Sequence, residues 1–287
     1  MNESRGARSE AATHPELPHG LALAWGVATS PKRGPKREIS VDRIVEAAME
    51  IADEEGINAV SMATVGKKVG FTSMSLYRYV SSKDDLLLLM QEEATGLPPE
   101  WHRESEPEGD VPPWRRRMEE LYQAQVEVYV RHPWVPELIR WVLGLPTQGA
   151  PTTPHTSAWL EAGLAAFVDT PLTAEERTAV TLAVTGQARW HGTVLAGYAQ
   201  SARSSGLDAD QVTDRENALF DAVIEEDEFP QLRAAIDAGV FLSDADPFQF
   251  GLARLLDGVE TYIVGMDRGE PDEGAFDWIQ GAGTDSA

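Results

Sequence analysis

The sequence predicts an all-α protein. Apolar residues recur at helical spacing in one segment after another, and no segment alternates convincingly between apolar and polar residues with the period of a strand. The chain has 287 residues, 42% of them hydrophobic, which is enough for a sizeable core. We therefore expect an N-terminal three-helix unit containing a helix-turn-helix, joined to a larger helical domain.

The composition indicates where the protein is located and excludes some kinds of site. The chain has no cysteine, which excludes a disulfide framework and a thiolate metal site. No apolar run approaches the roughly 18 residues that a membrane helix needs, and LALAWGVA near residue 21 is too short and lacks a basic lead for a signal peptide. We expect a cytoplasmic protein that does not contact a membrane.

Residues 1–38 show little periodicity and many Gly, Pro, Ser and charged positions, so we expect most of them to be disordered. The segment PKRGPKR at 31–37 is the exception. Its four basic residues, Lys36 and Arg37 among them, are typical of a basic arm that contacts nucleic-acid phosphates or the minor groove. A solvated linker is the alternative interpretation.

Residues 39–95 predict four helices. Ser40 is placed to cap the first, whose apolar positions recur at helical spacing until Gly56. A short helix over about 62–69, a turn centred on Gly70 and a second short helix from about residue 73 to 80 then form a helix-turn-helix.

The fourth helix begins at Ser82-Lys-Asp-Asp85, which matches a capping box ahead of LLLLM. It links the helix-turn-helix to the rest of the chain. Lys83 occupies its first turn, where a positive charge opposes the helix dipole. A lysine in this place indicates an anion nearby.

The helix-turn-helix lies in a stretch without acidic residues. Residues 56–83 contain no Asp or Glu, although the chain holds 47 of them against 24 Lys or Arg. Residues 31–83 hold nine Lys or Arg and seven Asp or Glu, a net charge of +2, so the rest of the chain, with 15 and 40, carries −25. Hydroxyls and donors beside basic residues suit DNA phosphates and base edges. The candidate DNA-contacting residues of this unit are Ser61, Thr72, Ser73, Met74, Ser75, Tyr77, Arg78 and Lys83.

From about residue 39 to 95 the chain resembles the DNA-binding domain of the TetR family of bacterial transcriptional regulators. The resemblance rests on IVEAAMEIADEEG, VSMATVGKKVGFTSMSLYRYV and SSKDDLL. It implies that Tyr77 and Lys83 grip phosphates, and that Thr72, Ser73 and Met74 lie where the family reads bases. More loosely, VYVRHPWVPEL, SAWLEAGLAAF and DPFQFGLARLLDGVE resemble the ligand-binding and dimerisation domain of the tetracycline-repressor branch.

Three positions depart from that family pattern. The chain has Met62 and Ala63 where tetracycline repressors carry Thr-Arg, whose Arg reads a base, and Gly66 replaces the usual Ala. The scaffold therefore carries over, but the operator sequence does not.

Residues 96–268 predict the larger domain, and residues 269–287 an acidic, loose tail. Thr173 to Glu176 matches a capping box that opens the least polar long helix, and a soluble helix that is apolar on nearly all sides must be covered on nearly all sides. The last helix carries apolar residues at alternating spacings of four and three, the pattern of helices that pack side by side. Doubled by symmetry, the two helices would form a four-helix dimer interface, as the family resemblance also implies. The expected interface residues are Val180, Val184, Phe248, Leu252, Leu255, Val259 and Tyr262.

A ligand pocket is expected in the body of this domain, where the family resemblance places it. Large and polar residues on neighbouring helices would suit a planar, mostly apolar molecule. The candidates are Trp114, Met118, Tyr122, Gln125, Trp141, Trp159, Gln187 and His191. The alternative is that each of these is an ordinary core residue. In tetracycline repressors, a pattern of His and Glu residues binds the metal ion that tetracycline chelates. This pattern is not found in the chain, so we expect a ligand that needs no metal.

An enzyme is the competing class. The chain lacks a Cys nucleophile, a Gly-x-Ser-x-Gly elbow, a phosphate-binding Gly-rich loop and a paired-His metal motif, and no cofactor is expected. We expect a homodimeric TetR-like repressor that binds a palindromic double-stranded DNA operator and is released by a small-molecule effector. A constitutive DNA-binding protein without a ligand switch is the alternative.

Overall fold

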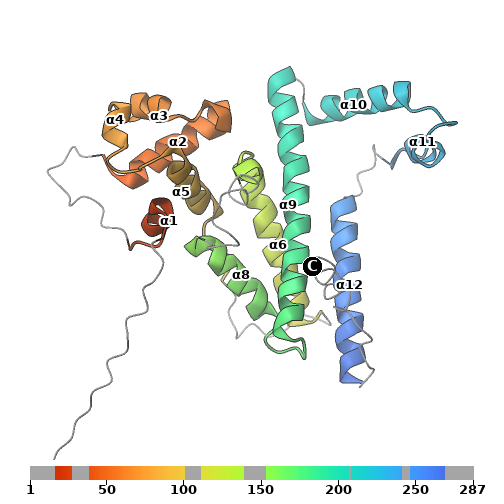
Figure 1. Ribbon diagram of the computed structural model, residues 1–287. Coiled ribbons are helices and arrows are strands. Elements are labelled where there is room, and N and C mark those ends of the chain that lie inside the picture. Colours follow the sequence, from red (N-terminus) through yellow and green to blue (C-terminus); the bar gives the residue numbers. More distant parts are fainter. Residues whose placement is uncertain are drawn as a thin grey trace, which may run out of the picture.

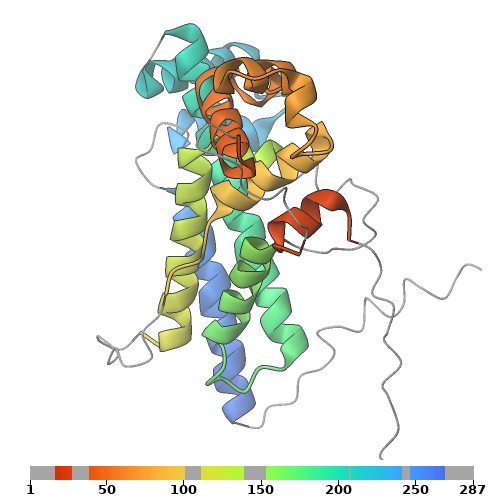
Figure 2. The same cartoon turned by 90° about the vertical axis from the view of Figure 1, so that its left-hand side faces the viewer.

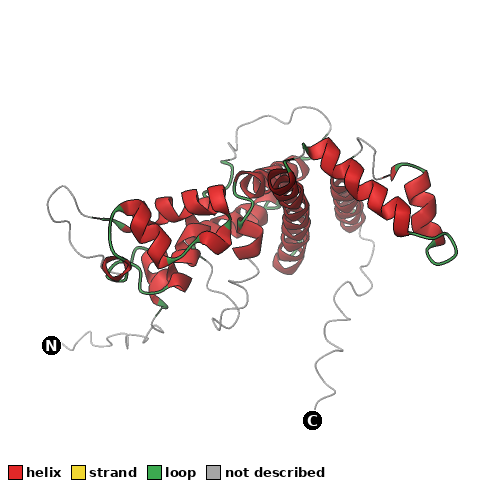
Figure 3. Ribbon diagram, turned by 90° about the horizontal axis from the view of Figure 1, so that it is seen from above, coloured by secondary structure: helices red, strands yellow, loops and turns green. Residues whose placement is uncertain are grey.

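The computed structural model describes residues 17–27, 39–100, 111–138, 153–206, 208–240 and 246–268. In this part of the chain every regular element is a helix (Figure 3). The predicted all-α class is confirmed. No helix within the described segments is both long enough and apolar enough to cross a membrane.

Four α-helices and one 3-10 turn make up the N-terminal unit, and its α-helices share one kind of start. They are α2 (Val41–Glu55), η1 (Ile57–Ala59), α3 (Met62–Val69), α4 (Ser73–Leu76) and α5 (Lys83–Thr95). Each α-helix follows a Ser or Thr whose hydroxyl accepts a hydrogen bond from the backbone N–H three residues further on. These caps satisfy backbone donors that a helix start leaves without partners, so the boundaries follow from the sequence.

The turn between α3 and α4 requires glycine at two positions. Gly70 has a φ of 81°, in the left-handed region, and the Phe71 N–H donates to the Gly66 carbonyl at 2.8 Å. A Cβ on Gly66 would lie 2.9 Å from the carbonyl oxygen of Phe71. An alanine at this position, as the family usually has, would therefore require the turn of this chain to shift.

The larger domain is built around four helices. They are α6 (Pro113–Arg131), α8 (Pro154–Ala166), α9 (Ala174–Ser205) and α12 (Pro247–Asp267). In Figures 1 and 2, α6, α9 and α12 run side by side, with the N-terminal unit at one end of α6. The predicted capping box of α9 is present, since Thr173 and Glu176 bond each other's backbone N–H.

Two further helices, α10 (Ala209–Val223) and α11 (Pro230–Asp237), form an arm that projects sideways from the end of α9 (Figure 1). None of the residues in 208–240 whose burial is described is buried. The polar composition of this stretch gives weak periodicity, so the sequence pattern says little about these two helices.

The N-terminal unit and the body share a core at the end of α6. Tyr129 and Trp134 belong to the same apolar cluster as the helix-turn-helix. The indole N–H of Trp134 donates to Asp53 of α2 at 2.6 Å, and His132 Nδ1 lies 3.0 Å from the same oxygen. A second tie joins α5 to the start of α8, where the Glu92 carboxylate accepts the His155 backbone N–H.

Part of residues 1–38, most of which are expected to be disordered, is helical. Residues 19–24 form a short helix, α1 (His19–Ala24), that packs against α5. Leu21 is only 2% exposed, and this burial stabilises a segment with no helical periodicity of its own. The expected capping box at Ser82 is only half formed, because the Asp85 carboxylate accepts the Gly20 N–H instead.

Candidate functional site

The second helix of the helix-turn-helix presents one face to solvent. Leu76 is fully buried beneath it, while Met74 is 73% exposed and Tyr77 45% exposed. Arg78, just after α4, and Lys83, at the start of α5, are exposed as well. This surface combines a large apolar group, a phenol and two cations, the kinds of group that contact bases and phosphates.

The hydroxyls predicted to contact DNA also shape the helix starts. Ser61 Oγ accepts the Thr64 N–H at 3.1 Å, and the Thr64 hydroxyl accepts the Ser61 N–H at 2.9 Å. Thr72 Oγ1 accepts the Ser75 N–H at 3.3 Å and lies 3.0 Å from the Ser75 hydroxyl. Ser61 and Thr72 therefore have capping roles that the sequence analysis did not assign.

One basic residue of the acid-free stretch turns away from this face. Lys68 Nζ lies 2.9 Å from Glu50 and 3.5 Å from Glu54, both on α2. The hydrogen bond to Glu50 raises the pKa of Lys68 above its usual value. The other basic residues of the stretch, Lys67, Arg78 and Lys83, are all exposed.

A polar pair is buried between α6 and α9 in the body. The Tyr122 hydroxyl lies 2.9 Å from His191 Nδ1, and the imidazole stacks on Phe248 with ring centroids 4.3 Å apart. Burial lowers the pKa of His191, an effect that Asp246, with its carboxylate 4.0 Å from Nε2, only partly opposes. Burial also raises the pKa of Tyr122 to about 12. At neutral pH the neutral imidazole and the Tyr122 hydroxyl can therefore pair in either hydrogen-bond direction, depending on the histidine tautomer.

Gln125, one turn further along α6, is a buried amide with an unmet hydrogen-bonding group. Its Nε2 reaches the Thr185 hydroxyl at 3.4 Å, and its Oε1 has no hydrogen-bond partner within the described structure. A buried polar atom without a partner costs about 1–3 kcal/mol. Such an atom marks a place where a bound molecule could supply the missing hydrogen bond.

The remaining candidate ligand residues either pack in the core or connect two helices by a hydrogen bond. Trp114 stacks on Phe167 at 5.5 Å between centroids, and Met118 is fully buried. Trp159 donates its indole N–H to the Gly96 carbonyl at 3.0 Å, which ties α8 to the end of α5. Gln187 donates to the Phe248 carbonyl at 2.8 Å and ties α9 to α12. Three predicted site residues, Lys36, Arg37 and Trp141, lie outside the described residues.

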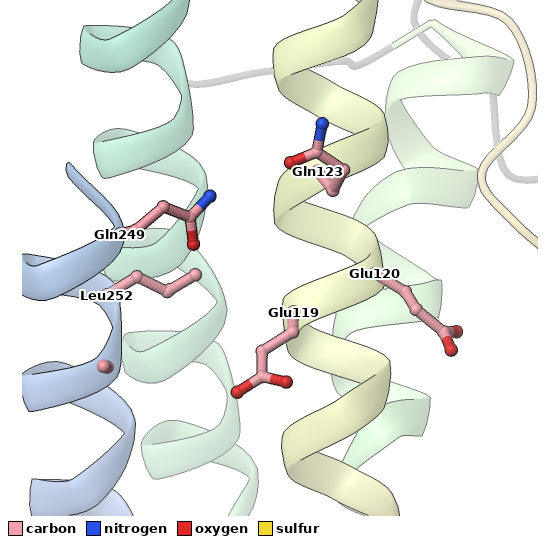
Figure 4. A pocket seen from close by; sticks show the side chains of 6 residues that line it. Glu119, Glu120, Gln123, Gln249 and Leu252 are labelled. Carbon is pink, nitrogen blue, oxygen red and sulfur yellow. The ribbon is translucent and has the colours of Figure 1, made fainter. Parts of the chain in front are cut away.

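A surface hollow lies between α6 and α12, and sequence reasoning did not identify it (Figure 4). It measures about 320 Å³ and is lined by Glu119, Glu120, Gln123, Gln249, Leu252 and Ala253. None of the candidate ligand residues lines it. In the described part of the chain, no group of three His, Asp or Glu side chains could hold a metal ion.

The expected dimer residues are not all on the surface. Val184, Leu252 and Val259 lie in the subunit's own core, because the apolar seam of α12 packs against α9 of the same chain. At 0%, 3% and 9% exposed, these three side chains offer a partner subunit little contact surface. The Tyr262 hydroxyl donates to Glu176, and Val180, Leu255 and Phe248 are half-buried. The large exposed apolar side chains on these helices are Leu182, Trp190 and Tyr198 of α9 and Phe250 and Val264 of α12.

Comparison with known families agrees with this architecture. The family described as "Bacterial regulatory proteins, tetR family" matches residues 44–90, and "Tetracyclin repressor-like, C-terminal domain" matches residues 106–263. The chain belongs to the TetR family of bacterial regulatory proteins. Over 270 residues it is 30% identical to the HTH-type transcriptional repressor DrrR1 of Streptomyces coeruleorubidus, with 93% of each chain covered.

Solved structures share the fold at low sequence identity. The Streptomyces coelicolor TetR family protein ActR, in complex with actinorhodin, has a TM-score of 0.59 at 18% identity, over 78% of this chain and 97% of that one. A possible TetR family regulator from Streptomyces coelicolor A3(2) has a TM-score of 0.56 at 20% identity, over 78% of this chain and 100% of that one. Both similarities concern the arrangement of the helices.

Proposed function

We propose that this transcriptional regulator is a cytoplasmic repressor without enzymatic activity. As a homodimer it binds a palindromic operator, and it leaves the operator when a small molecule binds in the body. The exposed α4 surface and the repressor DrrR1, similar over nearly the whole chain, support the first part. The buried polar group at Gln125, Tyr122 and His191 supports the second.

DNA would be contacted by α4 and the start of α5. Lys83, Tyr77 and Arg78 would meet phosphates, while Ser73 and Met74 would meet bases in the major groove. Two subunits related by a two-fold axis would place their α4 helices about one DNA turn apart, roughly 34–36 Å. The acidic remainder of the chain, with a net charge of −25, would favour this orientation over others.

The homodimer would form through the exposed faces of α9 and α12. Leu182 is 59% exposed and Trp190 63% exposed on α9, and Phe250 is 69% exposed on α12. Apolar side chains gathered on neighbouring helices mark a contact surface. Four such helices, two from each subunit, would bury these residues.

The effector would bind where Gln125 lacks a partner. The surroundings combine aromatic groups with the Tyr122 hydroxyl and His191, which suits a planar molecule bearing a few hydrogen-bonding groups. Entry of such a molecule would move α6 against α9. Because Trp134, just beyond α6, is bonded to Asp53 of α2, such a movement would reach the DNA-binding unit. Coupling of about 1–3 kcal/mol would weaken operator binding 5- to 150-fold.

Operator fragments retained from fragmented genomic DNA by the purified protein would supply the probe for a test. Planar aromatic compounds would then be screened for release of this DNA and for quenching of tryptophan fluorescence, with and without magnesium. We expect a compound that does both without the metal, and we expect Gln125→Leu to lower its affinity while leaving operator binding intact. Release only with magnesium would contradict a metal-free effector. A screen without any releasing compound would favour the constitutive alternative.

A further inference from the structure

The helix α1 lies against the joint between α4 and α5. The Gly20 N–H in α1 donates to Asp85 Oδ1 at 2.9 Å, and His19 Nδ1 lies 2.9 Å from the Ser81 hydroxyl and 3.4 Å from Asp85 Oδ2. Ser81 and Asp85 flank Lys83 on either side. In Figures 1 and 2, α1 lies beside the start of α5.

The contact is close as well as polar. A Cβ on Gly20 would lie 2.7 Å from Asp85 Oδ1 and 3.0 Å from Asp85 Cα, so a larger residue would push α1 off the turn. Leu21 is almost fully buried, and Leu23 and Ala24 pack against the apolar cluster of the helix-turn-helix. The segment is thus part of the DNA-binding unit, although 16 residues lie between Ala24 and Val41, the first residue of α2.

We propose that α1 is a brace that holds the turn between α4 and α5 in the geometry in which Lys83 meets an operator phosphate, with Gly20 and Asp85 as positioning residues. The inference rests on the proposed DNA contact of Lys83. A lysine on an unbraced turn samples more conformations, and binding must then select one of them at a cost in affinity. Three contacts on both sides of Lys83 remove part of that freedom before DNA arrives.

Asp85 provides a test in which two physical effects have opposite signs. Asp85→Asn removes the negative charge but keeps an oxygen that can accept the Gly20 N–H, whereas Asp85→Ala removes both. Loss of a carboxylate near DNA by itself strengthens binding. We therefore expect Asp85→Asn to bind the selected operator fragment at least as tightly as the unmodified protein, and Asp85→Ala to bind it about 3- to 10-fold more weakly, the scale of one hydrogen bond. Equal affinities for the two variants would overturn the proposal.

A double-mutant cycle with Lys83 separates positioning from plain stability. Gly20→Val should weaken operator binding about 3- to 10-fold when Lys83 is present and have almost no effect in the Lys83→Ala background, because coupled residues are not additive. Leu17→Val, at an exposed position just before α1, is the control and should bind normally. Melting temperatures would be recorded for each variant.

The cycle also distinguishes the two levels of the proposal. Additive losses would show that α1 only stabilises the fold and would overturn the brace. Normal binding by Gly20→Val beside weak binding by Lys83→Ala would overturn the brace and leave the DNA face intact. Normal binding by Lys83→Ala alone would refute the DNA contact, and the brace with it.

Discussion

The helix-turn-helix unit and the α10–α11 arm are both built from short helices, yet only the first encloses a core. Val65, Leu76 and Val80 are completely buried in the first unit. In the arm, none of the residues in 208–240 whose burial is described is buried. The large apolar side chains that the arm exposes are Leu219, Phe220, Val223, Phe229 and Val240.

The helix-turn-helix unit buries its apolar side chains within one subunit, whereas the α10–α11 arm exposes them to solvent. Short helices are marginal in water and gain most of their stability from packing. The helix-turn-helix obtains that packing from α2, α5 and the end of α6. The arm and the exposed α9–α12 face present surface of the kind that marks contact sites.

The largest effect is expected from a charge on the exposed α9 face. Leu182→Glu would bury an unpaired carboxylate in the proposed dimer interface, at a cost of about 3–5 kcal/mol. The dimer should dissociate while the helical content stays unchanged, because Leu182 contributes little to the core of its own subunit. Light scattering and circular dichroism would measure both properties. Leu97→Glu, at a 70% exposed position at the end of α5, is the matched control. A variant that stayed dimeric would place the interface elsewhere.

A pair of leucines compares the two regions directly. Leu76→Ala should lower the free energy of unfolding by about 2–5 kcal/mol, because it opens a cavity in a closed core. Leu219→Ala in the arm should change it by no more than about 0.5 kcal/mol, as is usual for exposed positions. Urea unfolding at one fixed protein concentration would measure both. An equal loss for Leu219→Ala would mean that the arm is packed in solution and would remove the contrast.

The sequence predicted the closed region better than the open one. Caps at Ser40 and Ser82 and the turn at Gly70 are local signals, and the structure follows them to within a residue. In that unit the caps and turns favour the same helix boundaries as the tertiary packing does. The sequence pattern was therefore sufficient to predict those boundaries. The start of the second short helix was predicted better than its end, because that helix was expected over about 73–80 and α4 spans only Ser73–Leu76.

The body was harder to predict, because periodicity shows that a helix has an apolar face but not what covers that face. The seam of α12 was assigned to a partner subunit, although Leu252 and Val259 pack inside the same chain. The helix α1 gave no signal at all, since it depends on a contact with Asp85, 65 residues away from Gly20. The ion pairs of Lys68 could not be predicted either, because its partners Glu50 and Glu54 lie on another helix, α2.

Two lysines of the DNA-binding unit offer a smaller but sharper test. Lys83→Ala should weaken operator binding by about tenfold at low salt, similarly for all sequences, and reduce the slope of log affinity against log salt by about 0.9. Lys68→Ala should change neither value much, because Lys68 is already paired with Glu50 and Glu54. Ser73→Ala should instead alter sequence preference. Equal losses for the two lysines would mean that Lys68 leaves its partners to contact DNA.

The smallest effect concerns the pH dependence of the body. Burial holds the pKa of His191 below that of an unfolded histidine, about 6.5, so the unfolded chain binds a proton more readily than the folded one. Stability from this group is therefore complete above the unfolded pKa and is lost as pH falls through the folded pKa. A protonated imidazole could no longer accept from Tyr122 and could only donate to its hydroxyl, which the pKa of Tyr122, about 12, keeps protonated in this range. Urea midpoints at about pH 7.5 and 5.5 should thus differ less for His191→Gln than for the unmodified protein, because glutamine has no proton to gain. An identical pH dependence in the two proteins would mean that His191 is charged, or well solvated, in the folded state. The interior between α6 and α9 would then differ less from the exposed surface than the structure indicates.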